Sequence, residues 1–410
     1  MTQAIKELKV GLDFGNKIQA VGRLAIRDRI IYFEYNDEFL QNGIEISPFR
    51  LPLQRGLIEL PQRPFEGLSG VFNDSLPDGW GRLLFDRLLI SQGILPGSQS
   101  SLDRLAHVGL AGMGALVYEP DNSPSDHIEP IDLDNLALQT EDVLQGNAEE
   151  VIGELLVLNG SSAGARPKAV IAVSQDFSQI HYGAGTLSKG FEPWLVKFPN
   201  SIDGRDAGAI EYVYSIMAKE AGVAVPDVHL FPSQKGAGYF AVKRFDRDDN
   251  KRLHMHTASG LLHSDFRTPS LEYEDLLNLT GVLTKDIREV EKMYRLAVFN
   301  VLAHNRDDHA KNFSYLMNEN GEWKMAPAYD LTFSSGPNGE QSSMVMGEGR
   351  NPKTSHLIKL GQEAKLSKKL IDEIIEQTNR SLSQWGNLAK KYNVTSTNTE
   401  LIKSAIKGNK

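Results

Sequence analysis

The sequence predicts an α+β protein with an N-terminal β-rich subdomain, followed by a body that has a mixed α/β small lobe and a mostly helical large lobe. Apolar and polar positions alternate through residues 8–36, as in half-buried strands. Further strand-like runs occupy residues 169–173, 192–198 and 239–245. From residue 270 onward the apolar spacing is helical. Because 410 residues exceed one ordinary core, two or three domains are expected, and we predict units at residues 1–122, 123–248 and 249–410.

Composition limits the kinds of function that the chain can have. Hydrophobic residues make up 40% and charged residues 24%, as in an ordinary soluble globular protein. The absence of cysteine excludes disulfides, zinc–thiolate sites and a cysteine nucleophile, so we expect a cytoplasmic protein. No apolar run approaches the roughly 20 residues that span a bilayer, and the N-terminus lacks the apolar core of a signal peptide. The net charge of −9 argues against a chain that wraps nucleic acid by itself.

The N-terminal unit begins with a predicted antiparallel meander, because three strand-like runs follow one another within residues 8–36. The segment Asp74-Ser-Leu-Pro-Asp-Gly79 has turn chemistry, since proline and glycine preset the backbone before a helix. Helices are predicted at residues 80–90 and 101–107. The glycines at 109–114 lack the dinucleotide-binding spacing, so we interpret them as a turn before a strand at 115–118.

The middle unit is predicted to start after a polar, proline-containing break at residues 122–127. One helix is predicted over residues 135–158, and it leads into a glycine- and serine-rich loop. A second helix is predicted over residues 208–221, with Gly222 as its C-cap. A long helix within residues 284–303 then leads toward the catalytic part of the large lobe.

Two acids and an amide downstream of that helix have the spacing of a phosphate-transfer site. Asp307 precedes Asn312 by five positions, and Asp330 lies in a short apolar segment further on. Protein kinases use this layout: one aspartate accepts the hydroxyl proton, while an asparagine and a later aspartate hold magnesium. Asp308 competes with Asp307 for the role of base, but the spacing to Asn312 favours Asp307. The body is therefore predicted to be protein-kinase-like.

A glycine-rich loop and a strand lysine are candidates for holding the phosphates of a nucleotide. In residues 159–168, small side chains let backbone amides approach a phosphate, and Lys168 adds a positive charge. Lys197 interrupts an apolar strand and Glu211 opens the next helical run, so the two can form the ion pair that orients a kinase lysine. Lys311 is a further candidate for a phosphate contact.

Two other patterns do not support a site. Asp13-Phe14-Gly15 has the letters of the kinase magnesium tripeptide, but it precedes every candidate catalytic loop, and kinases have the reverse order. His304 and His309, which flank Asp307 and Asp308, superficially resemble a metal phosphohydrolase site, and His254 and His256 add two more histidines. Such sites usually need an adjacent His–Asp pair and further ligands on other helices, which the sequence does not show.

Together these motifs resemble the HipA-type serine/threonine kinases, the toxins of type II toxin–antitoxin pairs. The resemblance spans nearly the whole chain. It rests on six ordered segments, residues 65–82, 161–168, 194–199, 239–247, 307–312 and 326–331. The second segment is similar to the family's autophosphorylated glycine-rich loop, and the fourth to the hinge strand that contacts adenine.

The resemblance implies the cofactors ATP and Mg²⁺, with Asp307 as proton acceptor and Asn312 and Asp330 as catalytic magnesium ligands. Nucleotide contacts are implied for Ala163, Gly164, Ala165, Arg166, Pro167, Lys168, Lys197, Lys243, Arg244, Phe245, His309, Lys311, Asn312, Tyr329 and Asp330. The chain departs from the family pattern at Asp308, where a small residue is common, and at Lys243, where an acidic residue occurs elsewhere. A hinge binds adenine through its backbone, so the second departure matters little.

The family also implies an off-switch in the glycine-rich loop. A serine seven positions before the loop lysine is autophosphorylated there, which ejects the loop. Counting back from Lys168 gives Ser161, and the adjacent Ser162 is an alternative. A phosphate at either position adds nearly two negative charges, which the nucleotide would repel.

The implied activity is growth-inhibiting phosphorylation of a translation-related cytosolic protein, such as an aminoacyl-tRNA synthetase. The implied partners are a small helix-turn-helix antitoxin and, through it, operator DNA, with no membrane. Two alternatives stay open: a non-catalytic kinase-shaped partner in a DNA-binding repressor complex, and a small-molecule kinase.

Overall fold

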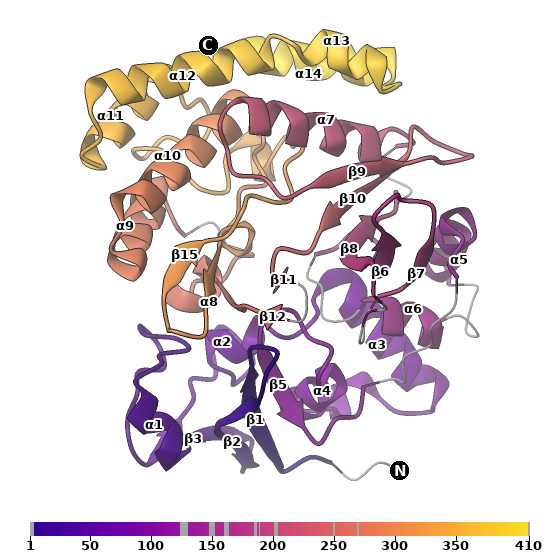
Figure 1. The fold of residues 1–410 in the computed structure, drawn as a ribbon, viewed down its shortest axis with the longest axis vertical. Helices are drawn as coiled ribbons and strands as arrows, with labels where there is room; N and C mark the ends of the chain where they lie inside the picture. Colours follow the sequence, from indigo (N-terminus) through magenta and orange to yellow (C-terminus); the bar gives the residue numbers. More distant parts are fainter. Residues whose placement is uncertain are drawn as a thin grey trace.

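The computed structural model describes residues 4–123, 130–146, 152–159, 164–183, 187, 189–200, 204–248, 251–268 and 270–408. The predicted α+β class is confirmed, because the chain combines antiparallel sheets with helices. Figure 1 shows the N-terminal subdomain at the bottom, the second sheet at the right and the large-lobe helices at the top and left.

The N-terminal subdomain is built on a five-stranded antiparallel sheet in the order β4-β3-β2-β1-β5. The strands are β1 (Glu7–Asp13), β2 (Ile18–Arg27), β3 (Ile30–Tyr35), β4 (Leu57–Glu59) and β5 (Leu116–Glu119). The helices are α1 (Asp37–Asn42), α2 (Gly70–Asn73), α3 (Gly79–Ser91) and α4 (Ser101–Val108), with a 3₁₀ turn at Pro96–Ser98. The predicted meander is thus present as β1, β2 and β3, which pair as sequential neighbours.

The small lobe has a second antiparallel sheet in the order β7-β6-β8-β10-β9. The strands are β6 (Lys168–Ser174), β7 (Ile180–Tyr182), β8 (Phe191–Lys197), β9 (Val228–Phe231) and β10 (Tyr239–Lys243). The helices are α5 (Leu133–Gln145), α6 (Ile152–Asn159) and α7 (Ala207–Glu220). The prediction of one helix over residues 135–158 is wrong, because α5 ends where Gly146 adopts a left-handed φ of 86°. Gly222 adopts a φ of 80° just beyond α7, as its predicted role in ending that helix requires.

Helix α3 packs with the second sheet although it precedes the predicted boundary at residue 122. Its buried Trp80 and Leu84 share a core with Ile171 of β6 and Val196 of β8. The N-terminal sheet has a separate core, centred on side chains such as Leu24 of β2. Helix α3 therefore ties the N-terminal subdomain to the small lobe, while the three domain ranges themselves stay a prediction.

The large lobe combines helices with a small sheet. Its helices are α8 (Ala258–Leu262), α9 (Tyr273–Thr284), α10 (Ile287–Leu302), α11 (Thr354–Glu363), α12 (Lys368–Leu382), α13 (Trp385–Lys391) and α14 (Ser396–Gly408), with 3₁₀ turns at Ala310–Asn312 and Pro337–Gly339. The strands are β11 (Arg247–Asp248) and β12 (Lys251–Arg252), which pair together, and β13 (His254–Thr257), β14 (Ser314–Met317) and β15 (Trp323–Met325), which form a sheet. The expectation of helix throughout from residue 270 is therefore wrong at β14 and β15. The turn that joins them is set by the Asn318 side chain, which accepts from the backbone N–H of Asn320, and by Gly321 at a φ of 78°.

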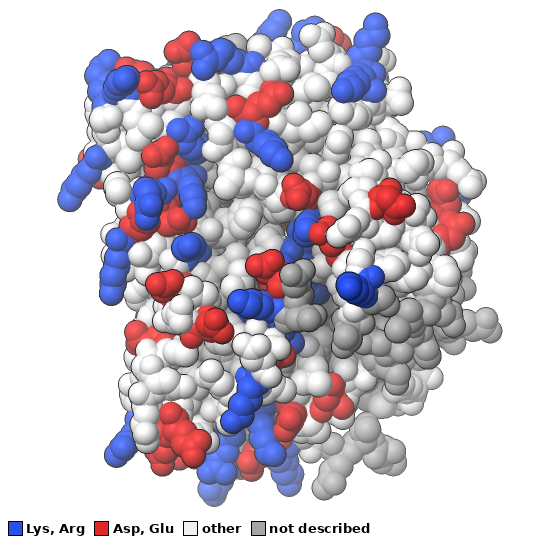
Figure 2. Space-filling view, in the orientation of Figure 1, with Lys and Arg blue, Asp and Glu red and all other residues white. Residues whose placement is uncertain are grey.

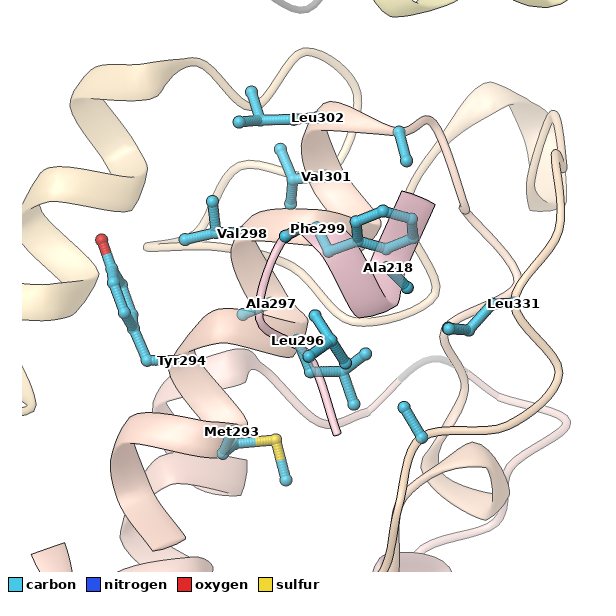
Figure 3. Packing of buried hydrophobic residues seen from close by; sticks show 14 of the residues in the cluster. Ala218, Met293, Tyr294, Leu296, Ala297, Val298, Phe299, Val301, Leu302 and Leu331 are labelled. Carbon is cyan, nitrogen blue, oxygen red and sulfur yellow. The ribbon is translucent and has the colours of Figure 1, made fainter. Parts of the chain in front are cut away.

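Helix α10 is the central helix of the large-lobe core. It starts at residue 287 because the Asp286 side chain caps it by accepting from the N–H of Arg288. Figure 3 shows Met293, Leu296 and Phe299 of α10 among other apolar side chains of this core, with Ala218 of α7 and Leu331 nearby; the cluster is fully buried or nearly so. The loop that follows α10 therefore starts from the packed core of the large lobe.

Two of the expectations from composition concern the surface charge and a membrane-spanning segment. On the face drawn in Figure 2, acidic and basic side chains are interspersed. Among the residues that the structure describes, no helix is both long and apolar enough to cross a bilayer.

Candidate active site

The catalytic loop, residues 302–312, leaves α10 through a turn that buried hydrogen bonds hold. The hydroxyl of Tyr214 donates to the carbonyl of Ala303 over 2.7 Å. The N–H of Asn305 donates to the carbonyl of Asn300 over 2.8 Å, and the side-chain amides of the same two residues are bonded at 3.0 Å. The intervening His304 has a φ of 60°. The direction of the loop is therefore set before Asp307 is reached.

The two adjacent aspartates of the catalytic loop have opposite environments. Asp307 is exposed, whereas Asp308 is 1% exposed. Four donors converge on the Asp308 carboxylate: the Tyr273 hydroxyl at 2.7 Å, the Gln341 amide at 2.9 Å, and the backbone N–H groups of Ser342 and Ser343 at 2.9 and 3.2 Å. Burial raises the pKa of Asp308 to about 6 in spite of these donors. Asp308 is thus enclosed in the large lobe, and Asp307 is the aspartate of the pair that can meet a substrate.

Lys197 joins three elements at one point. Its ammonium, at the end of β8, lies 2.5 Å from the Glu211 carboxylate on α7 and 2.6 Å from the Asp330 carboxylate. Asp330 has a φ of 57°, a conformation that aspartate adopts more readily than most residues. The predicted pair of Lys197 and Glu211 is therefore present, and it reaches the predicted magnesium ligand across the two lobes.

The protonation of this group follows from its charges. Burial lowers the pKa of the Lys197 ammonium, but the carboxylates of Asp330 and Glu211 outweigh burial and leave that pKa raised. Burial acts to raise the pKa of Asp330, yet Lys197 and Lys168 hold it well below its usual range. For Glu211, burial prevails over Lys197 and raises the pKa. Asp330 therefore stays an anion that can bind a cation.

The described part of the glycine-rich loop, residues 164–168, lies next to this group. Gly164 has a φ of 110°, and a Cβ atom there would clash with the Lys168 ammonium. The Arg166 guanidinium is 3.6 Å from the Glu211 carboxylate. Burial, with the nearby charge of Lys197, lowers the pKa of Lys168 to about 8. The structure thus brings three predicted phosphate contacts, Arg166, Lys168 and Lys197, to one place. Ala165 and Pro167 lie in the same loop, whereas Ser161, Ser162 and Ala163 lie outside the described residues.

The remaining predicted residues in and beside the catalytic loop are held by hydrogen bonds or ring contacts. The amide of Asn312 donates to the carbonyl of Asp307 over 2.7 Å, which orients its oxygen. The hydroxyl of Tyr329 donates to the carbonyl of Lys311 over 2.6 Å. The ring of His309 contacts Phe266, with centroids 5.4 Å apart. His309, within the loop, thus packs its ring against Phe266, and Tyr329, further along the chain, supports the loop backbone.

The predicted hinge, residues 243–245, is already engaged with the protein. The N–H of Lys243 donates to the carbonyl of Asp227, and the N–H of Arg244 to the carbonyl of Pro193, each over 2.9 Å. The Lys243 ammonium pairs with Glu192 at 2.7 Å. The Phe245 ring stacks on Tyr329 at 5.5 Å. The backbone N–H groups of Lys243 and Arg244 are therefore occupied by contacts within the protein, whereas the Phe245 ring lies against Tyr329 beside the catalytic loop.

Several polar contacts join the N-terminal subdomain to the body. The Asp246 carboxylate accepts from Arg247 at 2.6 Å and from the N–H of Gly114 at 2.7 Å. Arg252 donates to the carbonyl of Gly114 at 2.9 Å and is 3.4 Å from Asp13. Within residues 109–114, the Gly114 carbonyl therefore accepts a hydrogen bond from Arg252, and the Asp13 carboxylate lies beside the same guanidinium.

The histidine pair is part of this interface too. His256 is bonded to Asp74 at 2.6 Å and to the Ser47 hydroxyl at 3.0 Å, and His254 to the carbonyl of Ile46 at 2.9 Å. All of these partners lie in the N-terminal subdomain. The interpretation of His254 and His256 as something other than metal ligands agrees with these contacts.

Sequence reasoning missed Asp78, which lies in the turn before α3. Its carboxylate is 2.6 Å from the Lys311 ammonium and also accepts from the N–H of Gly164. An acid between proline and glycine is typical of a turn, so nothing local indicates a site. Its place within residues 65–82, one of the six segments of the family resemblance, was the available signal.

The donor set fits magnesium better than a metal that needs a full protein cage. Among the described residues, no group of three or more histidine, aspartate or glutamate side chains could hold a metal alone. Magnesium is usually bound by one or two protein oxygens, with waters and substrate phosphates completing its shell. The carboxylate of Asp330 and the amide oxygen of Asn312 are the two oxygens that the sequence predicts for this role, and both are of the chemical type that magnesium binds.

Comparison with known proteins adds sequence matches over both halves. The family model of the HipA N-terminal domain matches residues 16–119, and that of the HipA-like C-terminal domain matches residues 160–385. The chain is 26% identical over 329 residues to the serine/threonine-protein kinase toxin HipA of Shewanella oneidensis, covering 72% of this chain and 68% of that one. It is also 26% identical over 301 residues to the putative kinase Y4mE of Sinorhizobium fredii, covering 66% and 63% of the two chains.

A solved structure shows the same fold. It contains HipA of Shewanella oneidensis with HipB and operator DNA, and the match has a TM-score of 0.69 at 17% identity. The match covers 98% of this chain and 95% of that one, so the kinase-like architecture extends over both. The C-terminal family model alone matches more than half of the residues. The chain therefore belongs to the HipA family.

Proposed function

We propose that this chain is an ATP- and magnesium-dependent serine/threonine protein kinase that acts as a growth-inhibiting toxin in the cytoplasm. The observation that carries the proposal is the meeting of Lys197 with both Glu211 and Asp330, at 2.5 and 2.6 Å. A buried lysine between a helix glutamate and an acidic metal ligand is the arrangement by which kinases hold a nucleotide. The exposed Asp307 is a base that an incoming hydroxyl can reach.

The proposed reaction moves one phosphoryl group. Asp307 accepts the proton of a serine or threonine hydroxyl, the hydroxyl oxygen forms the new bond to the γ-phosphorus, and ADP leaves with the electrons of the broken bond. Lys197, Lys168 and Arg166 attract the phosphates and orient them. Asn312 and Asp330 would hold Mg²⁺, which would neutralise charge on the phosphates.

The proposed partners follow from relatives. HipA of Shewanella oneidensis was solved with HipB and operator DNA, and we propose a small helix-turn-helix antitoxin and operator DNA as partners here too. The proposed substrate is a translation-related protein such as an aminoacyl-tRNA synthetase. Autophosphorylation of Ser161 or Ser162 is the proposed off-switch, because added negative charge would oppose ATP binding at Lys168.

Phosphate transfer from γ-labelled ATP tests this proposal. In the presence of Mg²⁺ the protein should label itself on serine, and EDTA should abolish the labelling because Asp330 and Asn312 then hold no cation. Asp330→Asn should bind ATP·Mg²⁺ more weakly and give no detectable label. Nucleotide binding without any transfer, to itself or to added proteins, would favour the non-catalytic partner; transfer only to small molecules would favour a small-molecule kinase.

The affinity for ATP should depend on pH through Lys168. Its pKa of about 8 in the free protein means that the ammonium loses its proton, and its attraction for phosphate, as pH rises through that value. We therefore expect kcat/KM for ATP to fall above about pH 8, because kcat/KM reports the groups of the free enzyme. Lys168→Arg stays charged and should move this fall to higher pH. An identical pH profile in the two proteins would remove Lys168 from the phosphate site.

A further inference from the structure

The N-terminal subdomain reaches the glycine-rich loop through one turn, the Asp78 turn, which consists of residues 77–80. The Asp78 carboxylate accepts from the N–H of Gly164 through Oδ1, and the N–H of Trp80 donates to the Gly164 carbonyl over 3.0 Å. Gly79 has a φ of 47°, and a Cβ atom there would come within 2.5 Å of the Gly164 carbonyl oxygen. Both backbone groups of Gly164 are thus held, with no space for a side chain between.

The same carboxylate holds the catalytic loop. Its Oδ2 atom lies 2.6 Å from the Lys311 ammonium, which also lies 4.6 Å from the centre of the Phe266 ring. Lys311 is 8% exposed and directly precedes Asn312. Burial acts to raise the pKa of Asp78, but Lys311 and the Gly164 N–H outweigh it and keep that pKa lowered. Asp78 is therefore an anion with one oxygen on each loop.

We propose that Asp78 is a positioning residue for phosphate transfer. From the N-terminal subdomain, it fixes the position of the glycine-rich loop relative to the catalytic loop. The two loops belong to different lobes, since Gly164 lies just before β6 of the small lobe and Lys311 lies in the 3₁₀ turn Ala310–Asn312 of the large lobe. A single carboxylate bonded to both fixes their separation. The inference rests on the proposed kinase function, since the reaction needs the phosphates and the base at a set distance.

The two oxygens of the Asp78 carboxylate should affect the reaction in different ways. The bond to Gly164 keeps the loop over the phosphates, so its loss should weaken ATP binding. The bond to Lys311 orients the segment that carries Asn312, so its loss should slow the chemical step. The N-terminal subdomain is then part of the catalytic unit, and α3, which begins at this turn and packs on the second sheet, keeps the turn in place.

Two substitutions separate these effects. Asp78→Asn keeps an oxygen for the Gly164 N–H but presents a neutral amide to Lys311; we expect kcat to fall roughly 10- to 100-fold with a smaller change in KM for ATP, as for the loss of one charge-assisted hydrogen bond. Gly79→Ala pushes against the Gly164 carbonyl without altering charge, and it should raise KM for ATP several-fold or more. Gly93→Ala is the matched control, because Gly93 lies beyond the other end of α3 at a φ of 73° with nothing within 4 Å of an added Cβ.

Hydrogen exchange of the Gly164 amide gives a readout that does not depend on activity. Exchange should be faster in Asp78→Ala and Gly79→Ala than in the wild type and in Gly93→Ala. If the four proteins show this exchange pattern but the wild type transfers no phosphate, the kinase proposal fails, while the hold of the Asp78 turn on Gly164 stands. If the wild type is active, and Asp78→Asn and Gly79→Ala keep its kcat and KM per folded molecule, Asp78 has only a structural role and the inference is overturned.

Discussion

Asp307→Asn is expected to lower the rate of phosphate transfer by about 10²- to 10⁴-fold, the contribution of a positioned general base, without unfolding the protein. Asn cannot accept the hydroxyl proton, yet it has the same shape, and Asp307 is exposed. The bond from the Asn312 amide goes to the backbone carbonyl of residue 307 and survives the change. The measurement is single-turnover transfer from labelled ATP at saturating nucleotide, with thermal unfolding in parallel.

The control for this result is ATP affinity. Because Asp307 does not share the Lys197 ion pairs, the Kd of ATP·Mg²⁺ should stay within a few-fold of the wild type. A variant that retains transfer within threefold of the wild type would rule out Asp307 as the base. A variant that loses ATP binding as well would place Asp307 in the nucleotide site instead.

Asp308→Ala is expected to cost about 3 kcal/mol or more of the free energy of unfolding. Each buried donor left without a partner costs roughly 1–3 kcal/mol, and this change strands the Tyr273 hydroxyl, the Gln341 amide and two backbone N–H groups. Entry of water into the space would reduce the cost. Chemical denaturation of the purified protein measures it.

The neighbouring Asp307→Ala provides the matched control. It removes the same group one residue away, but from an exposed position, so its effect on the free energy of unfolding should stay within about 0.5 kcal/mol. The two variants should therefore separate cleanly: one is folded and inactive, and the other is destabilised. Equal stability of Asp307→Ala and Asp308→Ala would contradict the buried network around Asp308.

Much of the candidate site was predictable because its signals are local in sequence. The five-residue interval from Asp307 to Asn312 lies within one loop, and Lys197 stands out because a charge interrupts an apolar strand. The boundaries of elements were less predictable. Gly146 ended a helix that apolar spacing alone extended, and the β14–β15 turn depended on the side chain of Asn318. In one case the left-handed backbone of Gly146, and in the other the side-chain hydrogen bond of Asn318, overrode the periodicity of the surrounding residues.

By itself, the sequence determined the class of fold, the order of the motifs and the chemical types at the site, because each depends on residues close together in the chain. Only the tertiary structure decided which adjacent aspartate is exposed, since the burial of Asp308 depends on Tyr273 and Gln341, more than thirty residues away on either side. Only it revealed Asp78, whose partners Gly164 and Lys311 are 86 and 233 positions distant. A carboxylate in a turn has no local mark of its partners, because packing alone brings them together.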